Sequence, residues 1–340
     1  MEILSQLKNH KIISIIGMSK NSGKTVTLNY IIGQANEFDI IIGLSSIGRD
    51  GESEDLVTFT EKPMILVEEG TLIATASSLL SIGDANIEIL ESTDYRTPLG
   101  DIIIGRVRSP GYIQIAGPRT LREVKEVSDK LLSLGAEFVI IDGALDRKTP
   151  ATPAISNATI LSTGAVVSRD MNIVIEKTLH TANILSIPPV TQYREEIESL
   201  IDKERIAIID KEGYISDLDL RTALGKGQYI AEQIKKDSKY LVIPGSLVKS
   251  TLEDIVSSTN SYKDIDIVIN DGTKVFIEAR DYQRFMKLGV RLKTLFQINL
   301  IAISINPYAP SGYYFEPHLF LENMRKYIPK IKVLDVIGGD

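Results

Sequence analysis

The residues from Gly17 to Thr25 are the part of this chain whose types and spacing are best suited to chemistry. They read Gly-Met-Ser-Lys-Asn-Ser-Gly-Lys-Thr, they follow an apolar run over Ile12–Ile16, and a segment able to form a helix comes next. A strand, a glycine-containing loop and a helix N-terminus in that order turn backbone N–H groups and a partial positive charge toward an anion. The pattern therefore predicts a loop that binds nucleotide phosphates.

Within this loop, the expected roles follow from side-chain chemistry. Lys24 can reach the β- and γ-phosphates, and the hydroxyl of Thr25 can ligate Mg²⁺. The residues expected to contact the nucleotide are Gly17, Lys20, Asn21, Ser22, Gly23, Lys24, Thr25 and Val26. The first glycine usual in this pattern falls at Met18, with Gly17 one residue early. An ordinary turn between strand and helix, with Lys24 in solvent, is the alternative.

Asp142 is the second candidate, because it ends the apolar run Phe138–Ile141. At the carboxyl end of a buried strand, an aspartate can hold Mg²⁺ beside a phosphate-binding loop, directly or through water. Strand-terminal aspartates are common, so this assignment depends on the loop at 17–25. With that loop, Thr25 and Asp142 are the expected metal ligands, and Asp142 shares the catalytic role with Lys24.

A charged loop over Ser45–Glu52 follows another apolar run, Asp39–Leu44. In an open parallel sheet, the loops that follow the strands line the ligand crevice. Asp50 and Glu52 can orient water or metal near the γ-phosphate there, and Arg49 can offset developing charge. Asp50 is thus the third expected catalytic residue. A charged surface loop held by two glycines is the alternative.

Asn306, Arg106, Arg108 and Lys249 also lie in or beyond the ends of apolar runs. Asn306, fixed by the proline after it, can present its amide to a nucleobase, and a turn closed by its side chain is the alternative. The two arginines suit an anionic ligand or a partner carboxylate, and surface ion pairs are the alternative. Lys249 belongs to a second strand–turn–helix segment, 241–250, which lacks the Gly-Lys-Thr sequence and is only a candidate pocket for a second ligand.

The composition narrows the classes of function. Of 340 residues, 43% are hydrophobic and 24% are charged, as in globular proteins, and the formal net charge is −7. Because the basic residues do not cluster, nucleic acid is not expected as a partner. Cysteine is absent and the three histidines lie far apart, which argues against disulfides, thiolate catalysis and zinc–cysteine sites. Mg²⁺ carried with a nucleotide is the only metal expected.

The chain length predicts the number of domains, and the apolar runs and the first residues predict the location. A chain of 340 residues is long enough for two domains with separate cores. Its apolar runs are all shorter than the roughly eighteen residues needed to cross a membrane. The opening Met-Glu-Ile-Leu-Ser lacks the basic-then-apolar order of a signal peptide. We expect a globular protein without a membrane partner, located in the cytoplasm.

The pattern of apolar runs predicts an α/β fold with a largely parallel sheet. The first 165 residues alternate short Ile/Val runs with helix-compatible segments. Several runs are continuous, as in strands buried on both faces of a parallel sheet. The expected strands are 12–16, 39–44, 63–67, 86–91, 101–107, 138–141 and 159–162. The expected helices are 25–35, 71–80 and 120–134.

From Pro188 onward the sequence predicts a second, smaller α/β module. Strands are expected near 206–209, 240–243, 265–269 and 274–277, and a hairpin turn at 270–273 joins the last two. The runs 300–304 and 333–337 predict a strand–helix–strand return. The predicted division is a nucleotide-binding domain over 1–187, a second module without an assigned role over 188–295, and a C-terminal segment over 296–340 that can return to the first domain.

The loop 17–25, Asp142 and the Asn306-Pro307 turn together resemble one branch of the P-loop NTPases. That branch contains dethiobiotin synthetase, the MinD/ParA ATPases and the molybdopterin-guanine dinucleotide adaptor proteins. The resemblance implies a P-loop NTPase core whose Walker A loop binds ATP, or GTP, together with Mg²⁺. It gives Lys24 and Thr25 the phosphate and metal roles, Asp142 the strand-end acid role, and Asn306 the base-reading role.

The resemblance covers residues 10–165 and the last forty, and it does not extend to the middle of the chain. The branch often carries a lysine that reaches across a homodimer to the partner's nucleotide. That lysine would fall at Ser19, and Lys20 stands one place away. A homodimer is therefore an open alternative rather than a consequence of the motif.

Three runs resemble, more narrowly, a component of the reactivase of cobalamin-dependent lysine 5,6-aminomutase in amino-acid-fermenting bacteria. The runs are 15–29, 46–52 and 141–147. This resemblance implies ATP-powered remodelling of an inactivated cobalamin enzyme, without covalent chemistry on a metabolite. The partners it implies are the aminomutase and a reactivase co-subunit.

Three functions are open from the sequence. The favoured hypothesis is an accessory ATPase, a switch or reactivase that moves in response to the γ-phosphate. The second is an ATP-dependent ligase or synthetase that activates a small carboxylate held by Arg106, Arg108 or Lys249. The third is a module that holds nucleotide without turnover.

Overall fold

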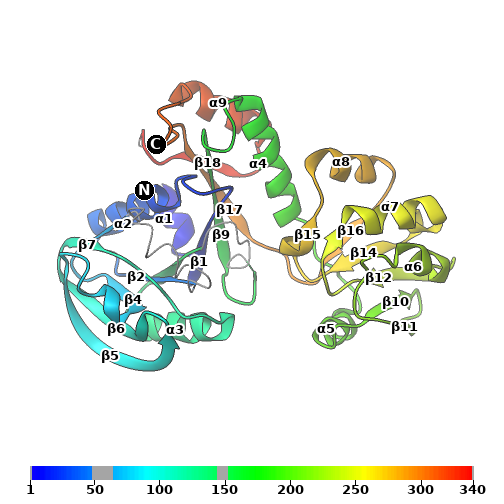
Figure 1. Ribbon diagram of the computed structural model, residues 1–340, viewed down its shortest axis with the longest axis horizontal. Helices are drawn as coiled ribbons and strands as arrows, with labels where there is room; N and C mark the ends of the chain where they lie inside the picture. Colours follow the sequence, from blue (N-terminus) through cyan, green and yellow to red (C-terminus); the bar gives the residue numbers. More distant parts are fainter. Residues whose placement is uncertain (1, 48–63, 144–151, 339–340) are drawn as a thin grey trace. The chain divides into compact units, whose positions relative to one another are not determined.

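The computed structural model describes residues 2–47, 64–143 and 152–338, and it has an α/β fold (Figure 1). The chain forms two compact units. Unit 1 combines Met1–Thr178 with Asn299–Asp340, and unit 2 is Leu179–Ile298. The chain thus leaves unit 1 once and returns to it. Among the described residues, no helix is both long enough and apolar enough to span a membrane.

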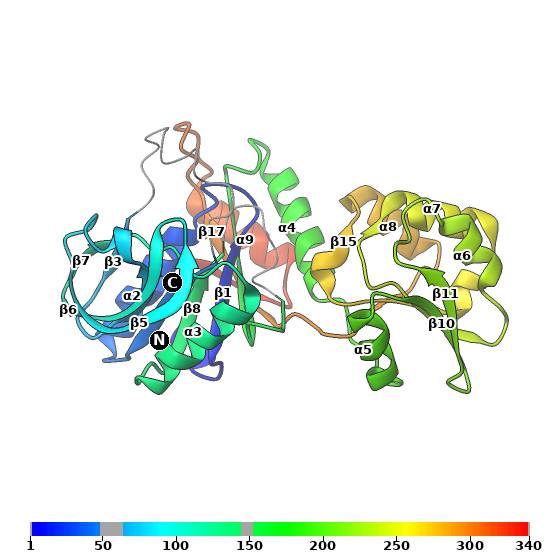
Figure 2. The same ribbon diagram turned by 60° about the horizontal axis from the view of Figure 1, so that its bottom comes forward.

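Unit 1 is built on a nine-stranded, mostly parallel sheet with the order β18-β17-β9-β1-β8-β2-β4-β6-β5 (Figures 1 and 2). The pairs from β18 to β4 are parallel, and β4–β6 and β6–β5 are antiparallel. Its strands are β1 (Ile12–Gly17), β2 (Ile42–Ser46), β4 (Leu72–Ala76), β5 (Asn86–Thr97), β6 (Gly100–Ser109), β8 (Phe138–Asp142), β9 (Ala158–Gly164), β17 (Leu300–Asn306) and β18 (Lys332–Asp335).

Within the described ranges, unit 1 also contains five α-helices and a small second sheet. The helices are α1 (Glu2–Leu7), α2 (Lys24–Glu37), α3 (Leu121–Ser133), α9 (Pro317–Tyr327) and α4 (Met171–Leu185), which continues into unit 2. The strands β3 (Ile65–Val67) and β7 (Gly111–Ile113) pair as an antiparallel two-stranded sheet.

The helices α2 and α3 pack on opposite faces of the sheet. Successive side chains of each strand point to opposite faces, so neighbouring residues of one strand contact different helices. On one side, Leu28 of α2 packs in a cluster with Ile13 and Ile140. On the other, Leu131 of α3 packs with Val139. We call these the α2 face and the α3 face. The strands β1 and β8 are covered on both faces. This explains why their sequences are continuous Ile/Val runs rather than alternating apolar and polar residues.

The helix predicted over 71–80 is wrong. The segment forms β4 and a 3₁₀ turn at Ser77–Leu79. Every residue of β4 is buried, and the strand lies between β2 and β6. Leu and Ala favour a helix locally, but a strand between two others gives each buried backbone group a partner and buries both sets of side chains. The tertiary setting therefore overrides the local preference.

Unit 2 contains a five-stranded sheet with the order β11-β10-β12-β14-β16. In it β10 is antiparallel to β11 and β12, while β12, β14 and β16 are parallel. The strands are β10 (Ile206–Asp210), β11 (Ile215–Leu220), β12 (Ser238–Val242), β14 (Asp266–Ile269) and β16 (Leu292–Thr294). The helices are α5 (Arg194–Asp202), α6 (Gly227–Gln233), α7 (Lys249–Ser258) and α8 (Ala279–Lys287).

The hairpin predicted at 270–273 is also wrong. The strand after it, β15 (Val275–Phe276), pairs in parallel with β13 (Leu247–Val248) and not with β14. The carboxylate of Asp271 accepts hydrogen bonds from the Thr273 N–H at 2.8 Å and from the Thr273 hydroxyl at 2.5 Å. These bonds cap a short 3₁₀ helix over Gly272–Lys274. The Asn-Asp-Gly sequence does turn the chain, but it does not send it back along β14.

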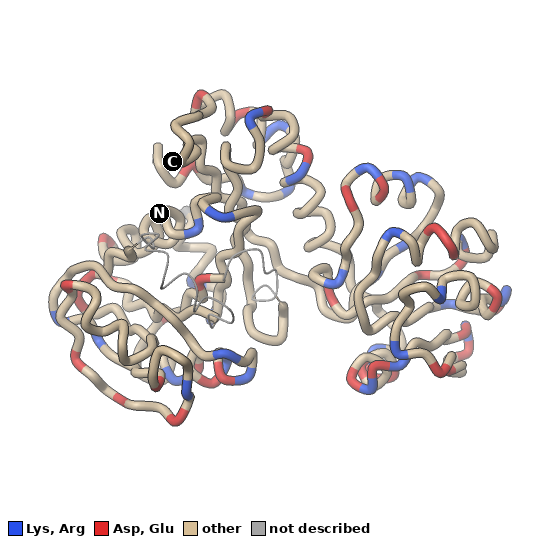
Figure 3. Tube along the Cα trace, viewed as in Figure 1, with Lys and Arg blue, Asp and Glu red and all other residues tan. Residues whose placement is uncertain are grey.

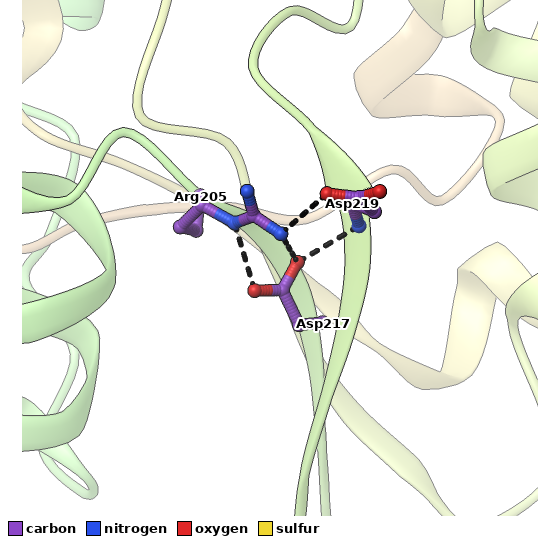
Figure 4. Close-up of polar contacts among 3 residues, drawn as sticks. All are labelled: Arg205, Asp217 and Asp219. Carbon is purple, nitrogen blue, oxygen red and sulfur yellow. Dashed lines mark hydrogen bonds and ion pairs between the residues drawn. The ribbon is translucent and has the colours of Figure 1, made fainter.

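A charged cluster holds β11, the edge strand of unit 2 (Figure 4). Arg205 donates to both carboxylate oxygens of Asp217, at 2.8 and 3.0 Å, and to Asp219 at 2.7 Å. The register with β10 shifts at this point, and Asp219 has a positive φ of 55°. The bulge brings both carboxylates to one guanidinium. Charges and bulges at an open edge also discourage pairing with another strand.

The hydrogen bonds from Arg205 and from the Asp219 N–H lower the pKa of Asp217. A lowered pKa stabilises the fold above the usual aspartate pKa of about 3.9, and this contribution is lost as the pH falls through the folded value. We expect Asp217→Asn to cost under about 1 kcal/mol at pH 7, because the carboxylate is 41% exposed. Urea unfolding between pH 7 and pH ~3 should show the difference from wild type shrinking at the acid end.

The exposed Asp94→Asn on β5 controls for the loss of one negative charge. A cost of Asp217→Asn that stays constant over this pH range would contradict the assignment.

Candidate functional site

The loop at 17–25 connects β1 directly to α2, as the sequence predicts. Gly23 precedes the helix with φ 101° and ψ 13°, a conformation that residues with a Cβ rarely adopt. Its carbonyl accepts the Thr27 N–H at 2.8 Å, so the first helical hydrogen bond begins there. No side chain caps α2 among the described residues. The N–H groups of the first turn are therefore available to an anion.

Gly17 lies where the side chains of Ser22 and Lys24 come together. A Cβ on Gly17 would overlap Ser22 Oγ and lie 3.0 Å from Lys24 Nζ. Ser22 is 1% exposed, and its hydroxyl has no hydrogen-bond partner within the described part of the chain. A buried hydroxyl and an ammonium at an uncapped helix N-terminus form a donor set that fits phosphate oxygens.

The remaining loop residues differ in exposure. Lys20 and Asn21 are exposed, and Asn21 has a positive φ of 61°. Thr25 is half-buried in the first turn of α2, and Val26 packs against the core of the α2 face. The side chain of Val26 therefore packs in the core, and only its backbone could contact a nucleotide.

Asp142 ends β8 beside β1. Its Cα pairs with Ile15 on β1 and with Ser46 on β2. Because side chains alternate along a strand, Asp142 shares the α2 face with Ile140. The carboxylate is half-buried at the strand end from which β1 continues into the loop. It thus lies on the same edge and the same face as the start of α2.

Asn306 ends β17 and lies against the loop. A Cβ on Gly23 would come within 2.9 Å of the Asn306 Cβ, so the two residues are in close contact. The Asn306 Oδ1 accepts the Tyr308 N–H at 3.0 Å. This is the side-chain-closed turn that the sequence left open as the alternative. A bidentate contact with a base would need both polar groups of the amide, and the Oδ1 is already used in this bond. The side chain of Asn306 is therefore not arranged to read a base in a bidentate way.

An open pocket of about 400 Å³ adjoins the loop. It is lined by Asn21 and by side chains within 165–169, after β9, and 309–313, after β17. The hydroxyl of Tyr313 donates to the Arg169 carbonyl at 2.7 Å, and the Arg169 guanidinium lies 6.0 Å from the centre of the Tyr313 ring. The pocket therefore offers an aromatic ring and a cation next to the loop.

Sequence reasoning missed this pair. The signal available was the position of Arg169 and Tyr313 a few residues after the strands β9 and β17, at the edge where ligands bind in parallel sheets. The strand β17 was predicted, but neither residue belongs to a recognisable motif.

The loop over 45–52 ends outside the described residues. Arg49, Asp50 and Glu52, and therefore the expected catalytic role of Asp50, lie outside the described ranges. The strand before them, β2, extends to Ser46, which places Ser45 and Ser46 in the sheet rather than in the loop. The Ser46 hydroxyl accepts the Gly117 N–H at 2.8 Å.

The cations proposed to hold a small carboxylate do not meet at this edge. Arg106 pairs with Leu72, the first residue of β4, because β6 runs antiparallel to it. Arg106 and Arg108 therefore lie at the sheet edge opposite the loop. Arg106 donates to the Leu134 carbonyl, and Arg108 forms an ion pair with Glu88. The sequence placed them at one functional edge because it did not show the direction of β6.

Lys249 begins α7 of unit 2 and is neutralised there. Its ammonium lies 3.0 Å from Asp281 and 3.7 Å from Glu253. Arg284 contacts the same two carboxylates. The two-residue strand β13 separates β12 from this helix, so the expected strand–turn–helix order does not occur. Both findings argue against an anion site at 241–250.

The candidate metal ligands are few. Within the described ranges, no group of three or more Asp, Glu, His or Cys side chains is arranged to hold a metal ion alone. Thr25 and Asp142 have the oxygen ligands that Mg²⁺ takes when it is held by one or two protein groups together with phosphates and water. Lys and Arg are interspersed with Asp and Glu along the chain (Figure 3).

No protein-family model matches this chain, and no curated protein matches it.

The backbone of Gly23 gives a direct test of the loop geometry. We expect Gly23→Ala to destabilise the protein by about 1–3 kcal/mol, because φ is 101° and the new Cβ would meet Asn306. Gly33→Ala in the exposed interior of α2 meets nothing within 4 Å and should stabilise by about 0.5–1 kcal/mol. Urea unfolding measures both. Equal effects of the two substitutions would mean that Gly23 does not hold this conformation.

Proposed function

We propose that unit 1 binds a Mg²⁺–nucleoside triphosphate, with ATP as the first candidate and GTP as the second, and hydrolyses it as an accessory ATPase of a partner protein. The observation that carries the proposal is the convergence of Ser22 and Lys24 beside Gly17, at the uncapped start of α2. A buried hydroxyl without a partner is costly unless a ligand satisfies it, and phosphate oxygens would do so. Thr25 and Asp142 would hold the metal.

The nucleoside would occupy the pocket after β9 and β17. The pocket volume of about 400 Å³ suits a base with its ribose, and Tyr313 offers a ring for stacking. Asn21 lines the pocket and belongs to the loop, so one ligand can reach from the phosphate site into the pocket. Asn306 would position Gly23 rather than read the base.

The accessory role is favoured over a ligase because of the cations. The three residues that a ligase would need for a small acid are paired with protein groups, and the two arginines lie at the opposite edge of the sheet. Unit 2, a compact unit of its own, would be the part that contacts the partner. The proposed partners are an aminomutase and its reactivase co-subunit. This narrower proposal rests on sequence resemblance.

Hydrolysis by the purified chain tests the proposal. We expect slow Mg²⁺-dependent release of phosphate that a protein partner accelerates, with lysine 5,6-aminomutase as the first partner to try. Lys24→Ala should lower the rate at least about 100-fold, because it removes the cation that neutralises the transferring phosphate. Lys11→Ala at the opposite end of β1 is the matched control and should keep the wild-type rate.

Other outcomes separate the rival functions. A Lys24→Ala variant that hydrolyses ATP at the wild-type rate would show that the hydrolysis site is not at this loop. Hydrolysis that requires a small carboxylic acid would identify a ligase. Tight nucleotide binding without phosphate release would identify a binding module.

A second substitution addresses the metal. Asp142→Asn keeps the shape of the side chain and removes its charge, so the fold should survive while the Mg²⁺ dependence of hydrolysis shifts to higher concentration. A magnesium titration of the rate, with thermal unfolding as the control for folding, measures this. An unchanged titration would place the acid elsewhere, and Asp50 is the next residue to test.

A further inference from the structure

Three buried hydroxyls lie directly behind the 17–25 loop. They belong to Thr27 in the first turns of α2, Ser162 near the end of β9 and Ser304 near the end of β17, and each is at most 1% exposed. Thr27 Oγ1 donates to Ser304 Oγ at 2.7 Å, Ser162 and Ser304 are 2.8 Å apart, and Thr27 and Ser162 are 3.2 Å apart. The three oxygens close a ring, which we call the hydroxyl ring.

The α2 face changes character at this level of the sheet. Earlier along the same strands, Ile160 and Ala302 belong to the apolar core under α2. Two residues later on each strand, the positions are serines, and their Cα atoms pair with each other. A helix packed on apolar side chains can adjust by sliding, whereas a ring of hydrogen bonds fixes distances. The polar residues therefore occur where the position of α2 matters for the loop.

Ser162 contacts both ends of the loop. Its carbonyl accepts the Met18 N–H at 2.9 Å, at the point where the chain leaves β1. Its hydroxyl contacts Thr27, whose own hydroxyl also lies 2.9 Å from the Gly23 carbonyl. Gly23 is the last residue before α2. One residue of β9 thus holds the beginning of the loop through its backbone and the end of the loop through its side chain.

We propose that the hydroxyl ring positions the loop for phosphate binding, with Thr27, Ser162 and Ser304 as positioning residues that do not touch the ligand; this rests on the proposed function. The ring fixes the first turn of α2 relative to β9 and β17. The N–H groups of that turn and the Lys24 side chain are then aimed at one place. Phosphate binding should depend on the ring more strongly than the stability of the fold does.

The test compares two threonines that undergo the same change. Thr27→Val removes the ring hydroxyl and keeps the shape of the side chain. Thr159→Val is the matched control, because Thr159 is also buried on β9, lies on the opposite face, and bonds Ser14 at 3.0 Å. Both should lower the unfolding temperature, Thr27→Val by more, because the Thr27 hydroxyl contacts three groups and the Thr159 hydroxyl contacts Ser14. Only Thr27→Val should raise the Kd of Mg²⁺–ADP, by roughly three- to tenfold for one lost hydrogen bond.

Titration calorimetry with Mg²⁺–ADP measures this at a temperature well below the unfolding transition of every variant, where the fraction of folded protein is close to one and does not alter the apparent Kd. Thr27→Ser restores the hydroxyl and should restore the wild-type Kd. Should Thr27→Val fail to fold, Ser304→Ala breaks the ring from outside the loop and should weaken binding in the same way. A wild-type protein that binds neither Mg²⁺–ADP nor Mg²⁺–ATP overturns the proposed function. A wild-type protein that binds, with equal Kd values for Thr27→Val, Thr27→Ser and Thr159→Val, overturns the hydroxyl ring alone.

Discussion

The candidate site depends on the burial of β1 between β8 and β9. With parallel neighbours on both sides and buried side chains on both faces, β1 has little freedom to shift, since any shift would break backbone pairs with two strands and disturb close packing on both faces. The chain therefore leaves the sheet at a fixed point, Gly17. The strands β8, β9 and β17 run parallel to β1 and bring Asp142, Ser162 and Asn306 to that edge.

Strand direction also decides which residues cannot take part. The antiparallel β6 carries Arg106 and Arg108 to the far edge, although both follow an apolar run in the sequence just as Asp142 does. A residue after a strand belongs to the functional edge only when the strand is parallel to its neighbours. This geometric constraint separates the accessory-ATPase hypothesis from the ligase hypothesis more sharply than the residue types do, because arginine suits an anion at either edge.

The sequence was sufficient to predict the elements that have strong local signals. The strand, loop and helix over 12–37, the helix α3, and the return through β17 and β18 all follow from periodicity and turn residues. The elements that failed, β4 and the turn at 270–273, are those whose state is decided by distant partners. Alanine-rich β4 is a strand only because β2 and β6 lie on both sides of it.

The site shows the same division between local and distant causes. Gly17, Gly23 and Lys24 could be chosen from spacing, because a loop that faces phosphates restricts backbone and charge within a few residues. The pocket residues Arg169 and Tyr313 lie 144 positions apart and meet only through the pairing of β9 with β17.

Ser162 and Ser304 are equally remote in sequence, and as isolated serines within apolar strands they give no signal of their own. Their contact becomes meaningful only when the register is known, because it is the register that puts two hydroxyls side by side under the first turns of α2. Local sequence thus specifies which groups the loop offers to an anion, while sheet register specifies how firmly those groups are held. The second property decides whether an anion-binding turn is rigid enough to distinguish one phosphate geometry from another.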